Sequence, residues 1–369
     1  HTRARKFADA TNGAVKAADI KKEISAKRNK DLLMSYGLIP LGKKADKELL
    51  ERYQFLQKFL KESKDFGAQR QESEKKAVGI ALQNLALNSG YGDVTRLTWS
   101  METELIKELL PYLSPKEIED VEVYVHINDE GKAEIKQIKA GKELNSMPAK
   151  LKKHPYVEEL KAVHKKLKDQ YTRSRIMLEQ AMEDCIRFEE NELRKLMQNP
   201  VIWPLLKHLV FICNGQAGFY TDGLLVTANA VCLPLKSKDE LRIAHPTDLY
   251  ASGDWHMYQK FLFDKAIRQP FKQVFRELYV PTPEEEGATQ SRRYAGNQIQ
   301  PQKTVAVLKG RRWVADYEDG LQKIYYKENI IATIYAMADW FSPADIEAPT
   351  LEFVCFHNRK DYKPMKISE

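Results

Sequence analysis

The residues best suited to acid–base chemistry lie in the segment Ala244-His245-Pro246-Thr247-Asp248. A histidine that ends a strand just before a proline would project at a sheet edge, where sites often form. Asp248 is close enough in sequence to orient the imidazole, as a general base requires. The same pattern also fits a structural turn, in which Asp248 caps the next helix and backbone groups satisfy His245. Both interpretations stay open, and the first makes His245 and Asp248 candidate catalytic residues.

A second candidate site is the window 287–315, which contains no acidic residue and follows Glu284, Glu285 and Glu286. Arginine forks bind phosphate, and aromatic rings stack on bases, so arginines beside aromatics are typical of phosphate or nucleic-acid surfaces. The alternative is that Arg292 and Arg293 pair with the acidic loop or with a part of the protein outside this sequence. The predicted ligand-binding or phosphate-binding residues are Arg276, Arg292, Arg293, Tyr294, Arg311 and Arg312.

An enzyme is the competing interpretation of these two segments. His245 would act as acid or base on a nucleotide or phosphorylated substrate, with the arginines as an anion clamp. The sequence lacks the motifs G-x-x-x-x-G-K-[ST], G-x-G-x-x-G, H-E-x-x-H and G-x-S-x-G, which removes the usual arguments for the commonest enzyme classes. The pattern therefore leans toward a protein without catalytic activity.

The positive charge is concentrated at the N-terminal end. The 369 residues carry 59 Lys and Arg against 52 Asp and Glu, a formal net charge of +7. Residues 1–90 hold 19 basic and 11 acidic residues, whereas the rest of the chain holds 40 and 41. Residues 1–30 alone hold nine basic and three acidic residues. A helix this basic can follow a phosphate backbone, or it can dock on preceding domains.

Composition excludes disorder and a membrane protein. A hydrophobic content of 43% is enough to bury a core, and no apolar run approaches the roughly 18 residues of a membrane span. The start lacks Met and a signal-peptide core, so we expect residues 1–369 to be a C-terminal piece of a longer protein whose N-terminal domains are further partners.

The cysteine pattern predicts a reducing cytoplasm and no metal or other cofactor. No C-x-x-C pair occurs, and no cysteine lies near a histidine at zinc-finger spacing. We expect all four to be buried free thiols: Cys185, Cys213, Cys232 and Cys355.

The spacing of apolar residues predicts helices over residues 1–118. One helix includes residues 49–60, and a second runs through residues 78–85 to a left-handed cap at Gly90. Ser114 and Glu117 predict a further helix start. Short paired helices of this kind are compatible with degenerate helical repeats.

The next segments mix strands with a long helix. Residues 121–127 alternate as a half-buried strand, and residues 132–139 can return as the second strand of a hairpin. Residues 157–197 lack Pro and Gly and keep a helical stripe, which predicts one long helix. The stripe is either an intramolecular spine or the seam of an oligomer.

The remaining pattern indicates an α+β protein. Short strands are predicted across residues 208–235 and 313–357, with helices at 254–268 and after Pro270. We expect a helical region, residues 1–118, followed by an α+β domain, residues 119–369. That domain would hold a mixed, mostly antiparallel sheet and the long spine helix.

Several segments, in order, resemble one family. They are residues 81–102, which include Gly90-Tyr91-Gly92-Asp93, and the segments 242–246, 269–279, 293–296 and 310–313. The ordered set resembles the uncharacterised C-terminal domain of MolR-like proteins, which are large bacterial chains that sometimes carry a WGR module. WGR modules occur in nucleic-acid-dependent enzymes, so the resemblance implies a nucleic-acid context and no catalytic residue. Gly310-Arg311-Arg312-Trp313 is not a WGR motif.

Together these patterns predict a binding or scaffolding module. The expected partner is nucleic acid or another phosphate-bearing ligand, and no membrane is involved. The alternatives are an enzyme that uses His245 with the arginines, and a structural module that assembles through the helix at 157–197.

Overall fold

The computed structural model describes residues 2–316, 320–338, 340 and 349–368. The chain forms two compact units, His1–Arg276 and Glu277–Glu369. The predicted α+β class is confirmed: a helical N-terminal region is followed by sheets whose described strand pairs are all antiparallel.

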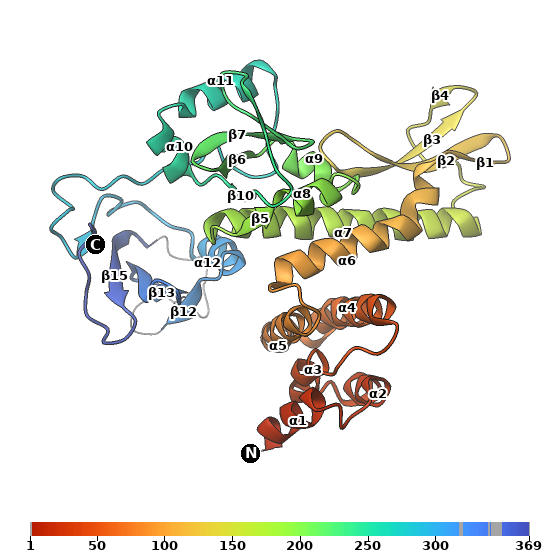
Figure 1. Ribbon diagram of the computed structural model, residues 1–369, viewed down its shortest axis with the longest axis horizontal. Helices are drawn as coiled ribbons and strands as arrows, with labels where there is room; N and C mark the ends of the chain where they lie inside the picture. The colour runs from red at the N-terminus through yellow and green to blue at the C-terminus, as the bar shows by residue number, and fades with distance from the viewer. Residues whose placement is uncertain (1, 317–319, 339, 341–348, 369) are drawn as a thin grey trace. The chain divides into compact units, whose positions relative to one another are not determined.

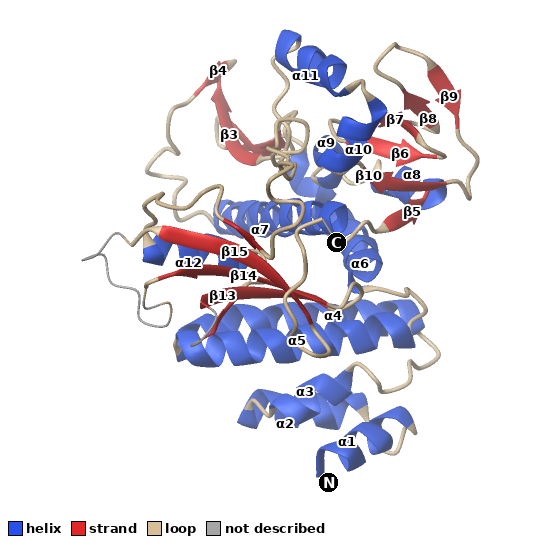
Figure 2. Cartoon of the chain, turned by 90° about the vertical axis from the view of Figure 1, so that its left-hand side faces the viewer, coloured by secondary structure: helices blue, strands red, loops and turns tan. Residues whose placement is uncertain are grey.

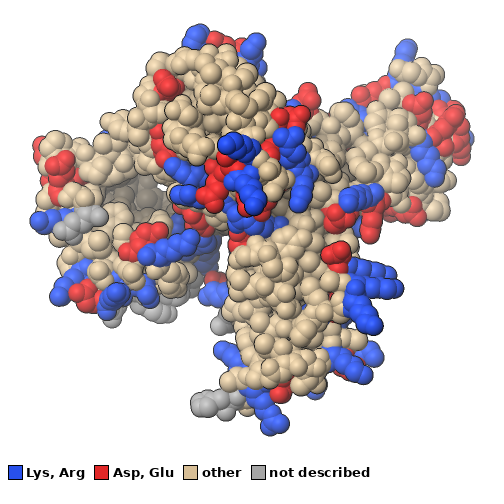
Figure 3. Space-filling model, in the orientation of Figure 1, with Lys and Arg blue, Asp and Glu red and all other residues tan. Residues whose placement is uncertain are grey.

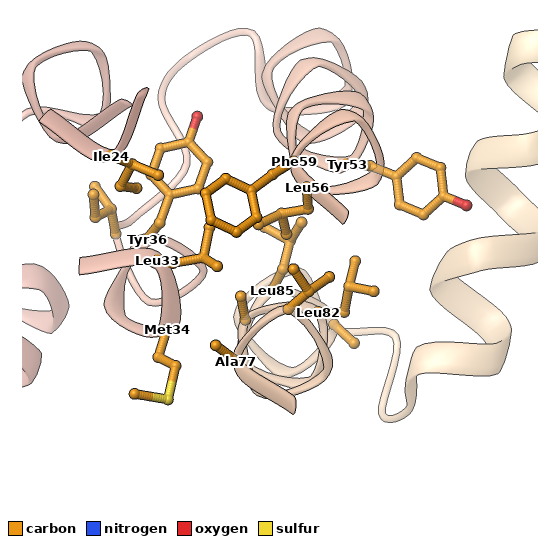
Figure 4. Close-up of a cluster of buried hydrophobic side chains, with 14 of the residues drawn as sticks. Ile24, Leu33, Met34, Tyr36, Tyr53, Leu56, Phe59, Ala77, Leu82 and Leu85 are labelled. Atoms are coloured by element: carbon orange, nitrogen blue, oxygen red, sulfur yellow. The ribbon is translucent and has the colours of Figure 1, made fainter. Parts of the chain in front are cut away.

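The N-terminal helices pack around one apolar core. They are α1 Thr2–Thr11, α2 Ala17–Lys27, α3 Lys30–Tyr36, α4 Ala45–Glu62, α5 Ala68–Asn88 and α6 Val94–Leu109, with the short 3₁₀ turns η1 Ser63–Phe66 and η2 Leu110–Leu113. Figure 4 shows Leu33, Leu56 and Leu85, from three different helices, pointing into this core. The helices predicted at 49–60 and 78–85 are confirmed, because their apolar stripes are the faces buried here.

The first sheet has the order β1-β2-β3-β4, with β1 Lys116–Ile118, β2 Val121–Ile127, β3 Ala133–Lys139 and β4 Lys142–Glu143. The hairpin of β2 and β3 was predicted and is confirmed. The helix start predicted at Ser114 is wrong. Residues 116–118 instead pair with 121–123, and Glu119, at a φ of 57°, supplies the tight turn between the strands.

The long helix is shorter than the predicted 157–197. Helix α7 spans Pro155–Glu183 and ends in a Schellman motif, in which Cys185 adopts a left-handed φ of 50°. The amide of Ile186 donates to the Ala181 carbonyl at 2.9 Å, and the amide of Cys185 donates to the Met182 carbonyl at 3.3 Å. Residues 187–189 then join a sheet as β5 Arg187–Glu189, and α8 Glu190–Leu196 follows.

The apolar stripe of α7 is buried within the chain. Figure 1 shows α7 running beside α6, and Leu160, Leu167 and Leu178 of α7 are fully buried in two clusters of this unit. The intramolecular spine is therefore confirmed as the packing of this stripe.

A six-stranded sheet with the order β5-β10-β6-β7-β8-β9 completes the first unit. Its further strands are β6 Val210–Cys213, β7 Gln216–Thr221, β8 Leu224–Val226, β9 Cys232–Pro234 and β10 Glu240–Ile243. The accompanying helices are α9 Ile202–Leu206, α10 Pro246–Ser252 and α11 Trp255–Asp264. The strands predicted over 208–235 are confirmed, as is the helix predicted at 254–268.

The helix predicted after Pro270 is wrong, because glutamine side chains bond the backbone of this segment. The Gln269 side chain accepts from the Val274 amide at 3.0 Å. Gln273 is fully buried and bonds both the amide and the carbonyl of Val210, at 3.0 and 2.8 Å. These contacts hold an irregular segment against the ends of β6 and β10 and leave no continuous helix.

The second unit contains a five-stranded sheet with the order β11-β15-β14-β13-β12. The strands are β11 Gln290–Ser291, β12 Val314–Asp316, β13 Gly320–Tyr325, β14 Ile330–Ala336 and β15 Leu351–Asn358, and Figure 2 shows β13, β14 and β15 side by side. Helix α12 Pro301–Gly310 packs Val305 and Leu308 against Leu321 and Ile334 on one face of the sheet. The strands predicted in this part of the chain are confirmed.

Two of the four cysteine predictions are wrong. None of the four forms a disulfide in the described structure; Cys213 and Cys355 are buried, whereas Cys185 and Cys232 are exposed. Cys185 lies in the turn that ends α7, and Cys232 lies in the edge strand β9. Among the described residues, no helix combines the length and the apolar character needed to cross a membrane.

Candidate functional site

His245 is the N-cap of helix α10. Its Nδ1 accepts the Thr247 amide at 3.3 Å, and the Asp248 carboxylate accepts the His245 amide at 2.9 Å, so the two residues form a reciprocal capping box. Pro246 occupies the first helical position, as its fixed φ favours. The two terminal nitrogens of Arg242, Nη1 and Nη2, donate to the Asp248 carboxylate at 2.5 and 2.7 Å.

This geometry favours the structural interpretation of His245 over a catalytic one. Burial lowers the pKa of His245, and this effect outweighs the Asp248 carboxylate, which raises the pKa; Arg276 and Arg242 lower it and Glu183 raises it by smaller amounts. Nδ1 of His245 accepts the Thr247 amide and also lies 2.9 Å from the Thr247 hydroxyl. The lone pair that a general base needs is occupied by the helix cap. Asp248 bonds Arg242 and the backbone rather than orienting the imidazole.

Arg276 lies in the same unit as His245, beside the C-terminal end of α7. Its guanidinium contacts the carboxylates of Glu179 and Glu183, the latter at 3.9 Å, and donates to the Lys272 carbonyl at 2.7 Å. Two carboxylates thus neutralise its charge. This arginine, which was predicted to bind phosphate, is therefore engaged by carboxylates within the first unit.

Arg293 and two tyrosines form an exposed surface on the second unit. The guanidinium carbon of Arg293 lies 5.2 Å from the ring centroid of Tyr279 and 6.0 Å from that of Tyr294. Arg293 also donates to the Val280 carbonyl at 2.8 Å, which fixes the direction of its side chain. Tyr294 is 47% exposed and Tyr279 is 38% exposed, so part of each ring faces solvent. We call Tyr279, Arg292, Arg293 and Tyr294 the Arg–Tyr surface.

The acidic loop does not neutralise this surface in the described part of the second unit. The carboxylate of Glu285 accepts from Ser291 Oγ at 2.6 Å, from the Thr282 amide at 2.9 Å and from the Tyr279 hydroxyl. Within those described residues, neither Arg292 nor Arg293 forms an ion pair with a carboxylate. The predicted alternative, that these arginines pair with residues 284–286, is therefore not what the geometry shows.

The hydrogen bonds of Glu285 make the second unit sensitive to acid. The hydroxyls of Ser291 and Tyr279 and the Thr282 amide lower the pKa of Glu285 from 4.5 to about 2. A depressed folded-state pKa stabilises the fold above the ordinary value, and this contribution is lost as the pH falls from about 4.5 through about 2. We expect segment 280–292 to lose hydrogen-exchange protection over this pH range, and to lose less in Glu285→Gln. Equal pH dependence in both proteins would contradict this assignment.

The remaining predicted arginines follow α12. Arg311 is the C-cap residue of α12, and Arg312, at a φ of 70°, turns the chain toward β12. Both side chains are exposed, and both have interaction partners. Arg293 and Tyr294 are thus in contact and Arg292 is an exposed neighbour in sequence, whereas Arg311 and Arg312 follow the end of α12.

The basic N-terminal end is partly neutralised. Arg3 pairs with Asp31 at 2.7 Å, and Arg28 pairs with Glu74 at 2.6 Å. On the face in view, Figure 3 shows Lys and Arg with a few Asp and Glu around the N-terminal helices, separated by other residues. The excess of basic residues at this end therefore does not form one uninterrupted phosphate-binding helix.

Sequence reasoning missed two residues of the second-unit site. Tyr279 bonds Glu285 and stacks on Arg293, and Ser291 is the second hydroxyl on the same carboxylate. The only available signal was their nearness in sequence to Glu285 and Arg293. Across the described residues, no three His, Cys, Asp or Glu side chains gather as metal ligands would.

Two family models match parts of the chain. A family of unknown function (DUF5724) matches residues 1–101, and a domain of unknown function (DUF4132) matches residues 141–313. Neither model covers half of the 369 residues. No curated protein and no solved structure matches the chain. Neither description mentions MolR-like proteins or a WGR module, so that resemblance stays a prediction.

Proposed function

We propose that the chain is a binding module and that the Arg–Tyr surface contacts a phosphate-bearing ligand, with single-stranded nucleic acid as the favoured partner. The observation that carries this proposal is the pairing of two adjacent arginines, free of carboxylate partners in the described structure, with an exposed tyrosine ring. Guanidinium groups bind phosphate oxygens, and a tyrosine face stacks on any base.

The fixed geometry of Arg293 supports the same proposal. Its bond to the Val280 carbonyl and its position over Tyr279 hold the guanidinium in place before a ligand arrives. Less side-chain entropy is therefore lost on binding than for a free arginine. The Glu285 carboxylate, which accepts from the same Tyr279 that contacts Arg293, is engaged by hydroxyls and an amide and forms no ion pair with Arg293 in the described structure.

The test is a salt series with fluorescent single-stranded oligonucleotides and the full chain. For Arg292→Ala/Arg293→Ala we expect weaker binding to all sequences and a log–log salt slope shallower by about 1.4, because two phosphate contacts are lost. Tyr294→Ala should weaken binding without changing the slope, since stacking releases no counterions.

A matched control removes the same charge elsewhere on the second unit. Lys327 and Lys360 are exposed, and Lys327→Ala/Lys360→Ala should keep the wild-type slope. An identical salt dependence for wild type and Arg292→Ala/Arg293→Ala would refute the proposal.

Kinship with MolR-like proteins is a separate proposal. It rests on the ordered segments between residues 81 and 313, of which residues 242–246, 269–279, 293–296 and 310–313 lie within the second matched domain. It adds no catalytic residue to the Arg–Tyr surface.

A further inference from the structure

A cationic pocket lies in the N-terminal helical region, in the first unit. Its volume is about 420 Å³, and it is lined by Arg28, Lys30, Arg70, Ser73 and Glu74. Cavities of this size accept small molecules. Three of the five lining side chains are cationic, and one is a hydroxyl.

Glu74 anchors the two arginines of this pocket. It is 1% exposed and accepts from Arg28 Nε at 3.0 Å, from Arg28 Nη2 at 2.6 Å and from Arg70 Nε at 3.0 Å. Phe66 also contacts both arginines, with each guanidinium carbon 4.6 Å from its ring centroid. Both guanidinium groups are therefore fixed without a ligand.

Four of the five N–H donors of Arg28 bond protein acceptors, whereas other donors of the pocket have fewer partners. Arg28 also donates to Glu62 at 3.2 Å and to the Phe59 carbonyl at 3.0 Å. For Arg70, the contact to Glu74 uses only Nε, and in the described structure its two terminal NH₂ groups have no protein acceptor. Lys30 Nζ donates to Ser73 Oγ at 2.6 Å and has no carboxylate partner among the described residues. The Ser73 hydroxyl accepts from Lys30 and can donate its own hydrogen.

We propose that this pocket binds the phosphate group of a small phosphomonoester, held by the terminal NH₂ groups of Arg70, the ammonium of Lys30 and the hydroxyl of Ser73. A planar fork, a point charge and a hydroxyl donor match the several oxygens of a phosphate. Three cations, Arg28, Lys30 and Arg70, face two carboxylates, Glu74 and Glu62, so these side chains together carry one net positive charge. This site is separate from the Arg–Tyr surface and does not depend on the proposed function.

The experiment is isothermal titration of the full chain with inorganic phosphate at constant ionic strength. We expect saturable binding with one site per chain, weakened at least tenfold in Arg70→Gln and in Lys30→Gln. Ser73→Ala should weaken binding several-fold, and Lys30→Arg should retain most of it because the charge remains. A second titration compares adenosine monophosphate with adenosine, and only the phosphorylated compound should bind.

The control variant is Lys75→Gln, which removes an exposed lysine on the same helix as Arg70 but outside the pocket lining. It should bind phosphate like the wild type. Arg292→Ala/Arg293→Ala should also bind phosphate normally, which separates this site from the Arg–Tyr surface. The absence of saturable phosphate binding to the wild type, or equal affinities for wild type, Arg70→Gln and Lys30→Gln, would overturn the proposal.

Discussion

Replacing Glu102 by Ala should lower the free energy of unfolding of the first unit by about 3 to 5 kcal/mol. Glu102 is 3% exposed and lies on α6. It accepts from the Tyr53 hydroxyl of α4 at 2.7 Å and from Arg173 of α7 at 2.7 Å. One carboxylate thus joins three helices, and its loss leaves a buried hydroxyl and a guanidinium without their partner.

The packing around Glu102 explains why this carboxylate matters more than a surface one. Tyr53 is fully buried in the helical core, so water cannot replace its acceptor without opening the contact between α4 and α6. Burial raises the pKa of Tyr53, and the Glu102 carboxylate raises it further, so the hydroxyl stays protonated and donates.

Urea unfolding followed by circular dichroism measures this effect. The matched control is Glu104→Ala on the same helix, because Glu104 is exposed and its one ion pair among the described residues is with Lys107, at 2.7 Å. Its expected cost is within about 0.5 kcal/mol. Equal losses for Glu102→Ala and Glu104→Ala would show that the buried network adds nothing to stability.

Replacing Gln273 by Ala should cost about 3 kcal/mol, since it leaves at least two buried backbone groups without partners. The side chain is fully buried and bonds the Val210 amide at 3.0 Å, the Val210 carbonyl at 2.8 Å and the Ala244 carbonyl at 2.9 Å. Val210 begins β6 and Ala244 follows β10. The side-chain amide of Gln273 therefore bonds the backbone of both strands at the end of their ladder.

Amide hydrogen exchange shows which strands lose protection in Gln273→Ala. Protection should fall first in residues 210–213 and 240–244, which form the paired ends of β6 and β10. Lys272→Ala, one residue away and exposed, should leave protection and stability near wild type. Full retention of protection in Gln273→Ala would show that the strand pairing does not need this side chain.

The sequence alone predicted the elements whose signals are local. Alternation along residues 121–127 reflects a strand with one buried face, and the threes and fours of residues 49–60 reflect a helix with one buried stripe. The adjacent Arg292, Arg293 and Tyr294 were also predicted as a binding group, because neighbours in sequence remain neighbours in space. Tyr279 and Ser291 were not, since only the fold sets them on Glu285.

Residues 269–279 show a second limit of prediction from the sequence. Pro270, Val274 and Leu278 predict a helix, and nothing in the segment indicates that the Gln273 side chain bonds the backbone of Val210, 63 residues away. A long-range hydrogen bond to buried backbone outweighs the weak local helix preference. The helix predicted for this segment is therefore wrong, because its conformation depends on a long-range contact.

Two helix ends show which features depend on the local sequence and which depend on tertiary contacts. Helix α5 ends with Gly90 at a φ of 81° and the Tyr91 amide on the Ala86 carbonyl at 2.9 Å, and α7 ends with the same motif around Cys185. The sequence determined the first end, because glycine adopts a left-handed φ without steric cost. Only the tertiary structure decided the second, in which pairing of residues 187–189 with β10 and burial of Phe188 offset the strain at a non-glycine residue.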